Sequence, residues 1–236
     1  VVVRRFAIFS REFSMSKKND KEHIVKEICK AAKLYKANLV GKRFLYVFDG
    51  RYIEVLYKNV NFKHLTGVEC NMSAADFYKN ALKNRLQSPQ IYFSASHPYS
   101  LCKRKIKHLC EISVLASSEN FMLEEIATET RTYKFGTTDL NFSLCMNKEY
   151  DSYGNEKGDC YIVESLRDED CFSRSKSAYT VTHILSKDND SASYTDLLFM
   201  DKSVTLDDLP APAREMLDGQ LLASLAETND SLLTTI

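Results

Sequence analysis

The chain has 236 residues, of which 44% are hydrophobic and 27% charged, and its formal net charge is zero. This composition is typical of a globular protein and speaks against a disordered chain. No run approaches eighteen apolar residues, and the opening VVVRRFAIFSREF has arginines inside its apolar part, so neither a membrane span nor a signal peptide is predicted.

The zero net charge conceals a division along the chain. Residues 1–110 contain 22 Lys and Arg against 8 Asp and Glu, whereas residues 111–236 contain 10 against 24. A basic half of this size suggests an anionic partner, and nucleic acid is the commonest one. The alternative is that the two halves neutralise each other across a shared core.

The cysteines indicate a reducing compartment. Their number, seven, is odd, and no C-x-x-C pair occurs among them. A cytoplasmic protein is therefore expected. Cys102, His108 and Cys110 lie close in sequence, but their spacing fits no zinc motif, so no metal site is predicted.

The first predicted elements are a helix and a hairpin. Apolar residues recur at three-to-four spacing over 21–39, which indicates an amphipathic helix. The stretch that begins at Met15 looks like a natural start, so residues 1–14 are expected to be translated upstream sequence. Residues 1–20, which precede the amphipathic helix, are assigned to an N-terminal extension. KRFLYVFDGRYIEVLY then contains two β-rich runs joined by Asp49-Gly50, a dipeptide typical of tight hairpin turns.

Two helices are expected next. Between the hairpin and the first of them lies NFKHLTGVEC, a short turn that carries His64. Ser73, with Asp76 three residues later, is predicted to cap the helix that follows. A further helix over 99–115 is expected to carry the KRKIKH cluster on its exposed side.

The second half of the chain reads as strands. EIATETRTYKFG, DLNFSLCMN, DCYIVESLRD and SAYTVTHILSK are separated by turn-forming residues. Helices in the first half and strands in the second predict an α+β domain over 21–205, with N-terminal helices packed on a small antiparallel sheet. The acidic segment 206–236 is expected to be a peripheral C-terminal tail.

Any catalysis is expected to come from side chains alone, because the sequence shows no metal-binding motif and no glycine-rich loop for a cofactor phosphate. RNA cleavage can proceed in this way, since the ribose 2′-hydroxyl is the nucleophile and the protein supplies an acid, a base and positive charge. His64 suits the proton steps. Thr66 would either hold a phosphate oxygen or fix the turn. A lone histidine on a turn is more often structural, and that alternative stays open.

Basic and hydroxyl side chains elsewhere are candidates for phosphate contact. In the KRKIKH cluster they are Lys103, Arg104, Lys105 and Lys107, with a plain solvated helix face as the alternative. Thr132 and Lys134 share one face of the strand RTYKF and present a hydroxyl and an ammonium group, with a plain exposed sheet face as the alternative. The histidines His23, His97, His108 and His183 are weaker candidates than His64.

The segment RYIEVLYKNVNFKHLTGV, followed by SAADFYKNALKNRL, resembles the phage-associated members of the barnase–EndoU–colicin–RelE-like nucleases. Their domains typically show F-x-HLTGV before an S-x-x-x-FY helix. The first motif is matched from Phe62 to Val68, and the second by Ser73, Phe77 and Tyr78. The likeness covers about residues 20–190 and is most specific at the first motif.

The resemblance implies a barnase/RelE-like fold, with N-terminal helices against a four-stranded antiparallel sheet, and RNase activity without a metal or cofactor. It supports His64, Thr66 and Lys134 as site residues. Ser165 and Arg167 would complete a phosphate-binding face, and Lys63 and Thr132 are expected to contact nucleic acid beside them. One departure is Tyr133, which stands where the family often has an acidic residue.

The predicted function is therefore that of a metal-independent endoribonuclease of a phage or mobile element. Its substrate is RNA, and an inhibitor or immunity protein is a further expected partner. The alternative is a non-catalytic nucleic-acid-binding protein on the same scaffold. A third hypothesis is a protein-interaction module that acts through the acidic tail.

Overall fold

The computed structural model describes residues 2–223, with side chains from residue 20 onward. The end of the expected acidic tail, residues 224–236, lies outside the described residues. Within the described residues the chain divides into two compact units: unit 1 comprises residues 2–37 and 59–111, and unit 2 comprises residues 38–58 and 112–223. The domain boundaries predicted at residues 20 and 205 stay predictions.

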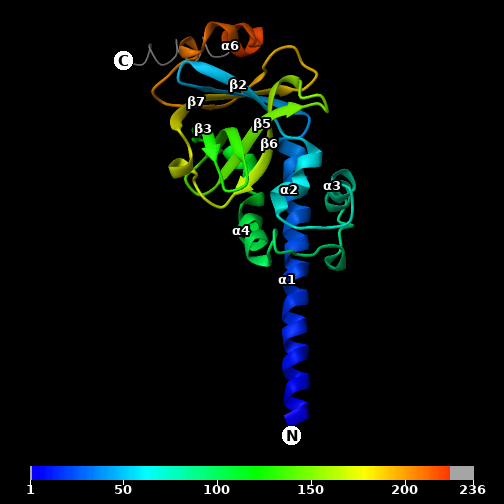
Figure 1. The fold of residues 1–236 in the computed structure, drawn as a ribbon. Helices are drawn as coiled ribbons and strands as arrows, with labels where there is room; N and C mark the ends of the chain where they lie inside the picture. The colour runs from blue at the N-terminus through cyan, green and yellow to red at the C-terminus, as the bar shows by residue number, and fades with distance from the viewer. Residues whose placement is uncertain (1, 224–236) are drawn as a thin grey trace, which may run out of the picture. The chain divides into compact units, whose positions relative to one another are not determined.

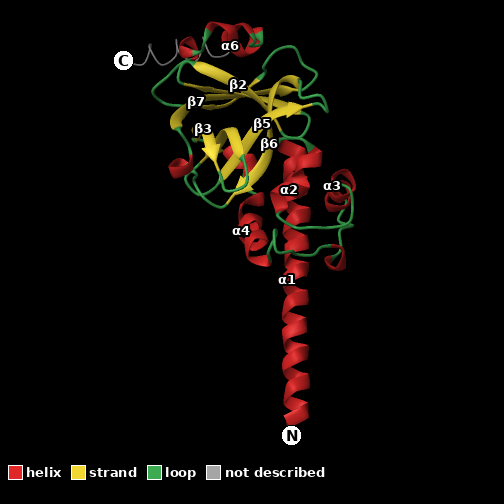
Figure 2. Ribbon diagram, in the orientation of Figure 1, coloured by secondary structure: helices red, strands yellow, loops and turns green. Residues whose placement is uncertain are grey.

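Unit 1 is helical (Figures 1 and 2). Its helices are α1 (Val2–Asn38), α2 (Phe62–Thr66), α3 (Ala74–Leu82) and α4 (Tyr99–Leu109), with short 3-10 turns at Asn59–Asn61 and Ser88–Gln90. The helix predicted over residues 21–39 is confirmed as the second half of α1. Within the described residues, none of the helices, α1 included, combines the length and apolar character that crossing a bilayer requires.

Three aromatic side chains from α1, α2 and α3 form the centre of unit 1. The ring of Phe62 lies 5.1 Å from that of Tyr35 and 5.2 Å from that of Tyr78, measured between centroids. All three residues are buried. Ser73 caps α3 as predicted, because its hydroxyl accepts a hydrogen bond from the Asp76 amide. The aromatic cluster therefore fixes α2 against its neighbouring helices.

Unit 2 contains all the strands of the described chain. They are β1 (Lys42–Phe48), β2 (Arg51–Leu56), β3 (Phe121–Ala127), β4 (Thr132–Thr138), β5 (Ser143–Tyr150), β6 (Glu156–Arg167), β7 (Ser177–Asp188) and β8 (Asp196–Met200), and the helices α5 (Ile112–Leu115) and α6 (Ala211–Glu215) belong to the same unit. The predicted hairpin is confirmed: Phe48 pairs with Arg51 across the Asp49-Gly50 turn, where both turn residues have positive φ.

The strands close into a barrel, which corrects the expectation of helices packed on a small antiparallel sheet. The order is β1-β2-β6-β5-β4-β3-β7, and β7 pairs back onto β1, so seven strands form a closed ring with β8 added outside β7. The β2–β6 pairing is parallel, whereas the other pairings are antiparallel. The prediction was wrong because closure depends on the long-range β1–β7 pairing, which no local pattern reveals.

Aromatic side chains from strands that are not neighbours meet across this barrel. The rings of Phe48 on β1 and Phe135 on β4 lie 5.8 Å apart, and Phe135 lies 4.9 Å from Tyr161 on β6. None of these strands are neighbours in the sheet, so the contacts cross the interior. Burial of such rings is a large hydrophobic contribution to folding, and the barrel is a packed core.

The segment after β8 packs on the outside of β1. Leu209, Ala213 and Leu217 are buried in one cluster with Leu45 and Val47. The described first part of the segment that was expected to be peripheral thus belongs to the core of unit 2. This cluster covers the face of β1 that carries Leu45 and Val47. The alternate residues Phe44, Tyr46 and Phe48 on the other face are fully buried as well, so β1 is buried on both faces.

A buried histidine ties this segment to the barrel and predicts a pH dependence. His183 on β7 is 0% exposed; one ring nitrogen lies 2.9 Å from the Thr205 carbonyl oxygen and the other 3.0 Å from the Thr182 hydroxyl. Desolvation lowers the pKa of His183, although the Thr205 carbonyl, Asp208 and Asp201 act in the opposite direction. Below about pH 6.5, the ordinary pKa of histidine, the unfolded chain therefore binds a proton that the folded chain excludes.

We expect the free energy of unfolding to fall as the pH drops below about 6.5, and the His183→Gln variant to lose less stability than the parent over the same range. The difference in slope should be at most about 1.4 kcal/mol per pH unit, the value for one proton. Urea unfolding at pH 7.5 and pH 5.5 measures it. Equal slopes for the two proteins would contradict the prediction.

Candidate active site

The histidine of the HLTGV motif is on the exposed side of α2. His64 is exposed, whereas Phe62 and Leu65 on the same helix are fully buried. This five-residue helix is anchored by its buried side, and its other side presents the imidazole to solvent. This position is compatible with proton transfer to a substrate.

The turn after His64 is held by Thr66 and Gly67. The Thr66 hydroxyl donates to the Lys63 carbonyl oxygen at 2.7 Å and accepts from the Val68 amide at 3.2 Å. Thr66 is 0% exposed, so of the two roles expected for it the structure favours fixing the turn. Gly67 ends α2 with φ +72°, and a Cβ there would lie 3.0 Å from Cδ of Lys105. Both conditions favour glycine.

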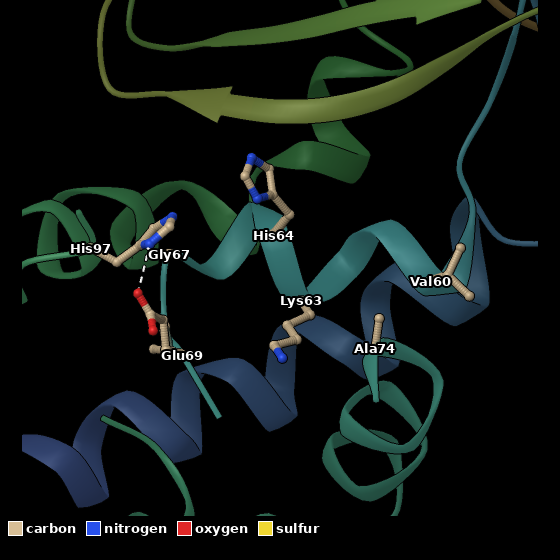
Figure 3. A pocket seen from close by; sticks show the side chains of 8 residues that line it. Val60, Lys63, His64, Gly67, Glu69, Ala74 and His97 are labelled. Carbon is tan, nitrogen blue, oxygen red and sulfur yellow. Dashed lines mark hydrogen bonds and ion pairs between the residues drawn. The ribbon is translucent and has the colours of Figure 1, made fainter. Parts of the chain in front are cut away.

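A pocket of about 190 Å³ opens beside α2 (Figure 3). It is lined by Val60, Lys63, His64, Gly67, Val68, Glu69, Ala74 and His97. The Lys63 ammonium group donates to the carbonyl oxygens of Cys70 and Met72 at 3.0 and 3.1 Å. Lys63 was predicted to contact nucleic acid. In the structure its ammonium group stabilises the segment between α2 and α3 through these two hydrogen bonds.

A second imidazole and a carboxylate belong to the same pocket. His97 Nδ1 lies 2.9 Å from Oε1 of Glu69, and the ring centroids of His64 and His97 are 6.2 Å apart with an interplanar angle of 81°. Hydrogen bonds from the Ser94 hydroxyl and from His97 lower the pKa of Glu69. The pocket therefore holds two imidazoles and one ionised carboxylate. Among the described residues, His, Cys, Asp and Glu side chains form no group of three or more that could hold a metal ion.

The basic helix is only partly exposed. Lys103, Arg104 and Lys107 on α4 are exposed and line a groove with Asp20 and Glu27 of α1. In contrast, Lys105 is 5% exposed and its side chain packs beside Gly67, which corrects the expectation that the whole KRKIKH cluster faces solvent. The sequence pattern predicted the basic cluster but not how deeply each of its side chains is buried.

The predicted strand residues lie in unit 2. Thr132 and Lys134 are on the exposed face of β4, as their spacing predicted. The Lys134 ammonium group lies 3.3 Å from carboxylate oxygens of both Glu124 and Glu125. Desolvation acts against its charge, but the hydrogen bonds with Glu125 and Glu124 outweigh it and raise the pKa of Lys134. Its charge is thus shared with two carboxylates.

The other two predicted phosphate ligands lie on β6, where Ser165 pairs with Cys145 of β5 and Arg167 pairs with Ser143. Ser165 is only 2% exposed. The Arg167 guanidinium donates to the Thr128 hydroxyl at 3.1 Å and lies 5.8 Å from the ring centroid of Tyr133. Tyr133 is buried, so the residue that departs from the family pattern serves here as a platform beneath Arg167.

The sequence ranked His97 below His64 and gave no indication of Glu69. An isolated bridge between Glu69 and Tyr92 brings the two segments together, with backbone hydrogen bonds of 3.1 and 2.9 Å. The segments are far apart along the chain, and neither shows a periodic pattern that would predict the pairing. A histidine followed by Pro98 indicated only a loop.

A family model described as phage-Barnase-EndoU-ColicinE5/D-RelE like nuclease4 matches residues 27–203. Searches of curated proteins and of solved structures return no match to the chain. The matched range includes the pocket of unit 1 and all the strands of unit 2. The resemblance carried by the HLTGV motif is therefore confirmed, and the chain belongs to this family as a nuclease of the barnase–EndoU–colicin–RelE-like type.

Proposed function

We propose that the chain is an endoribonuclease that cleaves RNA without a metal ion, by attack of a ribose 2′-hydroxyl on the adjacent phosphodiester. The observation that carries the proposal is the exposed imidazole of His64 at the edge of a pocket, in a chain that belongs to a nuclease family. An imidazole can take up or release a proton near neutral pH, which this reaction requires.

In this reaction His64 accepts the proton of the 2′-hydroxyl, and O2′ forms a bond to phosphorus. The bond between phosphorus and O5′ breaks, and the leaving oxygen takes up a proton. The products are a 2′,3′-cyclic phosphate and a 5′-hydroxyl end. Thr66 acts by holding the turn that carries His64, because its hydroxyl is engaged with the backbone on both sides.

The roles proposed for Lys134, Ser165 and Arg167 stay predictions. Lys134 and Arg167 lie in unit 2, and each is expected to contribute positive charge to contacts with phosphates of the RNA. Lys103, Arg104 and Lys107 are exposed and would contribute salt-sensitive contacts to phosphates. Substitution of each cation by alanine, followed by measurement of kcat/KM, tests these assignments separately.

The test of the proposed function uses labelled RNA and the full chain in the presence of EDTA. We expect cleavage that survives chelation and leaves cyclic phosphate ends, and no cleavage of an oligonucleotide with 2′-deoxyribose at the mapped linkage. Cleavage of the deoxy substrate would contradict 2′-hydroxyl attack. Salt-sensitive retention of RNA without cleavage would instead support the alternative, a non-catalytic nucleic-acid-binding protein.

A further inference from the structure

The pocket beside α2 contains a second imidazole that can exchange protons with a substrate. His97 comes from the loop that precedes α4, and its side chain is 33% exposed. Its ring lies 6.2 Å from that of His64, centroid to centroid (Figure 3). Both rings line the same pocket, so one bound phosphodiester can contact both of them.

Glu69 and Ser94 fix the position of His97. Nδ1 of His97 is hydrogen-bonded to the Glu69 carboxylate, which also accepts from the Ser94 hydroxyl. The His97 amide in turn donates to the Ser94 hydroxyl oxygen at 3.1 Å, and the Ser94 amide donates to the His97 carbonyl oxygen at 3.1 Å. An ionised carboxylate only accepts hydrogen bonds, so Nδ1 keeps its hydrogen and proton exchange is confined to Nε2. This is the arrangement of a carboxylate that orients a catalytic histidine.

We propose that His97 is a second catalytic residue, which donates its Nε2 proton to the 5′-oxygen of the leaving nucleoside while His64 accepts the proton of the 2′-hydroxyl. This inference rests on the proposed function. The proton lost by O2′ goes to His64, the proton gained by O5′ comes from His97, and the electron pair of the broken bond stays on O5′. Proton transfer through solvent then restores both rings.

The carboxylate supports the assignment of His97 as the acid. A general acid begins the reaction as the positively charged imidazolium, and Glu69 at 2.9 Å compensates that charge. Glu69 touches His97 and not the reacting atoms, so it is a positioning residue. We expect Glu69→Gln to lower kcat with little change in KM, because an amide can present a donor as well as an acceptor to Nδ1 and so no longer fixes the ring.

The experiment compares two versions of one oligoribonucleotide that the parent cuts. One is unmodified, and the other has sulfur in place of O5′ at the cleaved linkage, so that the leaving group departs as a thiolate without protonation. We expect His97→Ala to slow cleavage of the unmodified RNA by about 10²–10⁴-fold and to recover most of that loss on the sulfur substrate. His64→Ala should remain slow on both, because it lacks the base.

His97→Asn separates catalysis from structure. The asparagine amide can replace Nδ1–H in the bond to Glu69, but it has no group equivalent to the proton on Nε2. We expect this variant to be as slow as His97→Ala on unmodified RNA. Recovery of activity by His97→Asn, or an equal loss on both substrates for His97→Ala, would overturn the inference while leaving the proposed function intact. Failure of the parent to cut any RNA would overturn the proposed function itself.

Discussion

Substitution of His64 by alanine is expected to lower kcat/KM for RNA cleavage by about 10²–10⁴-fold, the contribution of one positioned acid or base. Folding should be unaffected, since the imidazole is exposed and α2 is anchored by Phe62 and Leu65. The rate of appearance of cyclic phosphate ends measures the effect, and thermal unfolding measures stability.

His23→Ala is the matched control for this substitution. His23 is also an exposed histidine of unit 1, but it lies on α1 and does not line the pocket beside α2. His23 lines the groove that contains Lys103 and Arg104, so we expect parental kcat from this variant, with any effect confined to KM. A His64→Ala protein that cuts RNA as fast as the parent would remove His64 from the mechanism.

Truncation of Phe48 is expected to cost about 3–5 kcal/mol in the free energy of unfolding, as is usual for a fully buried phenylalanine. Its ring is 0% exposed and lies 5.8 Å from that of Phe135 and 5.7 Å from that of Tyr179. Because Phe48 and Phe135 come from strands that are not neighbours, the variant would leave a cavity where these two strands meet across the closed barrel. Urea unfolding of Phe48→Ala measures the loss.

Val114→Ala provides the comparison on the surface of the same unit. Its side chain is 61% exposed, so its truncation should change stability by no more than about 0.5 kcal/mol. If Phe48→Ala were as mild as Val114→Ala, the interior contact between β1 and β4 would not contribute to stability and the packed barrel would be contradicted.

Local features of the sequence were predictable because their causes lie within a few residues. The Asp49-Gly50 turn requires positive φ angles that this dipeptide tolerates, and the Ser73 cap requires only a hydroxyl three residues before an amide. The HLTGV motif is also local, and it indicated both the nuclease family and the placement of His64 on a short turn. These features depend on the geometry of a few consecutive residues, so they can be predicted from the sequence.

The closed barrel, the burial of Lys105 and the pairing of Glu69 with His97 were decided only by the tertiary structure. Each depends on segments that are distant along the chain: β1 with β7, Lys105 with Gly67, and Glu69 with the loop that ends at Pro98. An alternating or helical pattern shows which side of a segment is buried but not which segment covers it. The free energy that selects such partners comes from packing over the whole fold, so the sequence alone determined the elements and the motif, while the fold determined their closure and the second imidazole of the pocket.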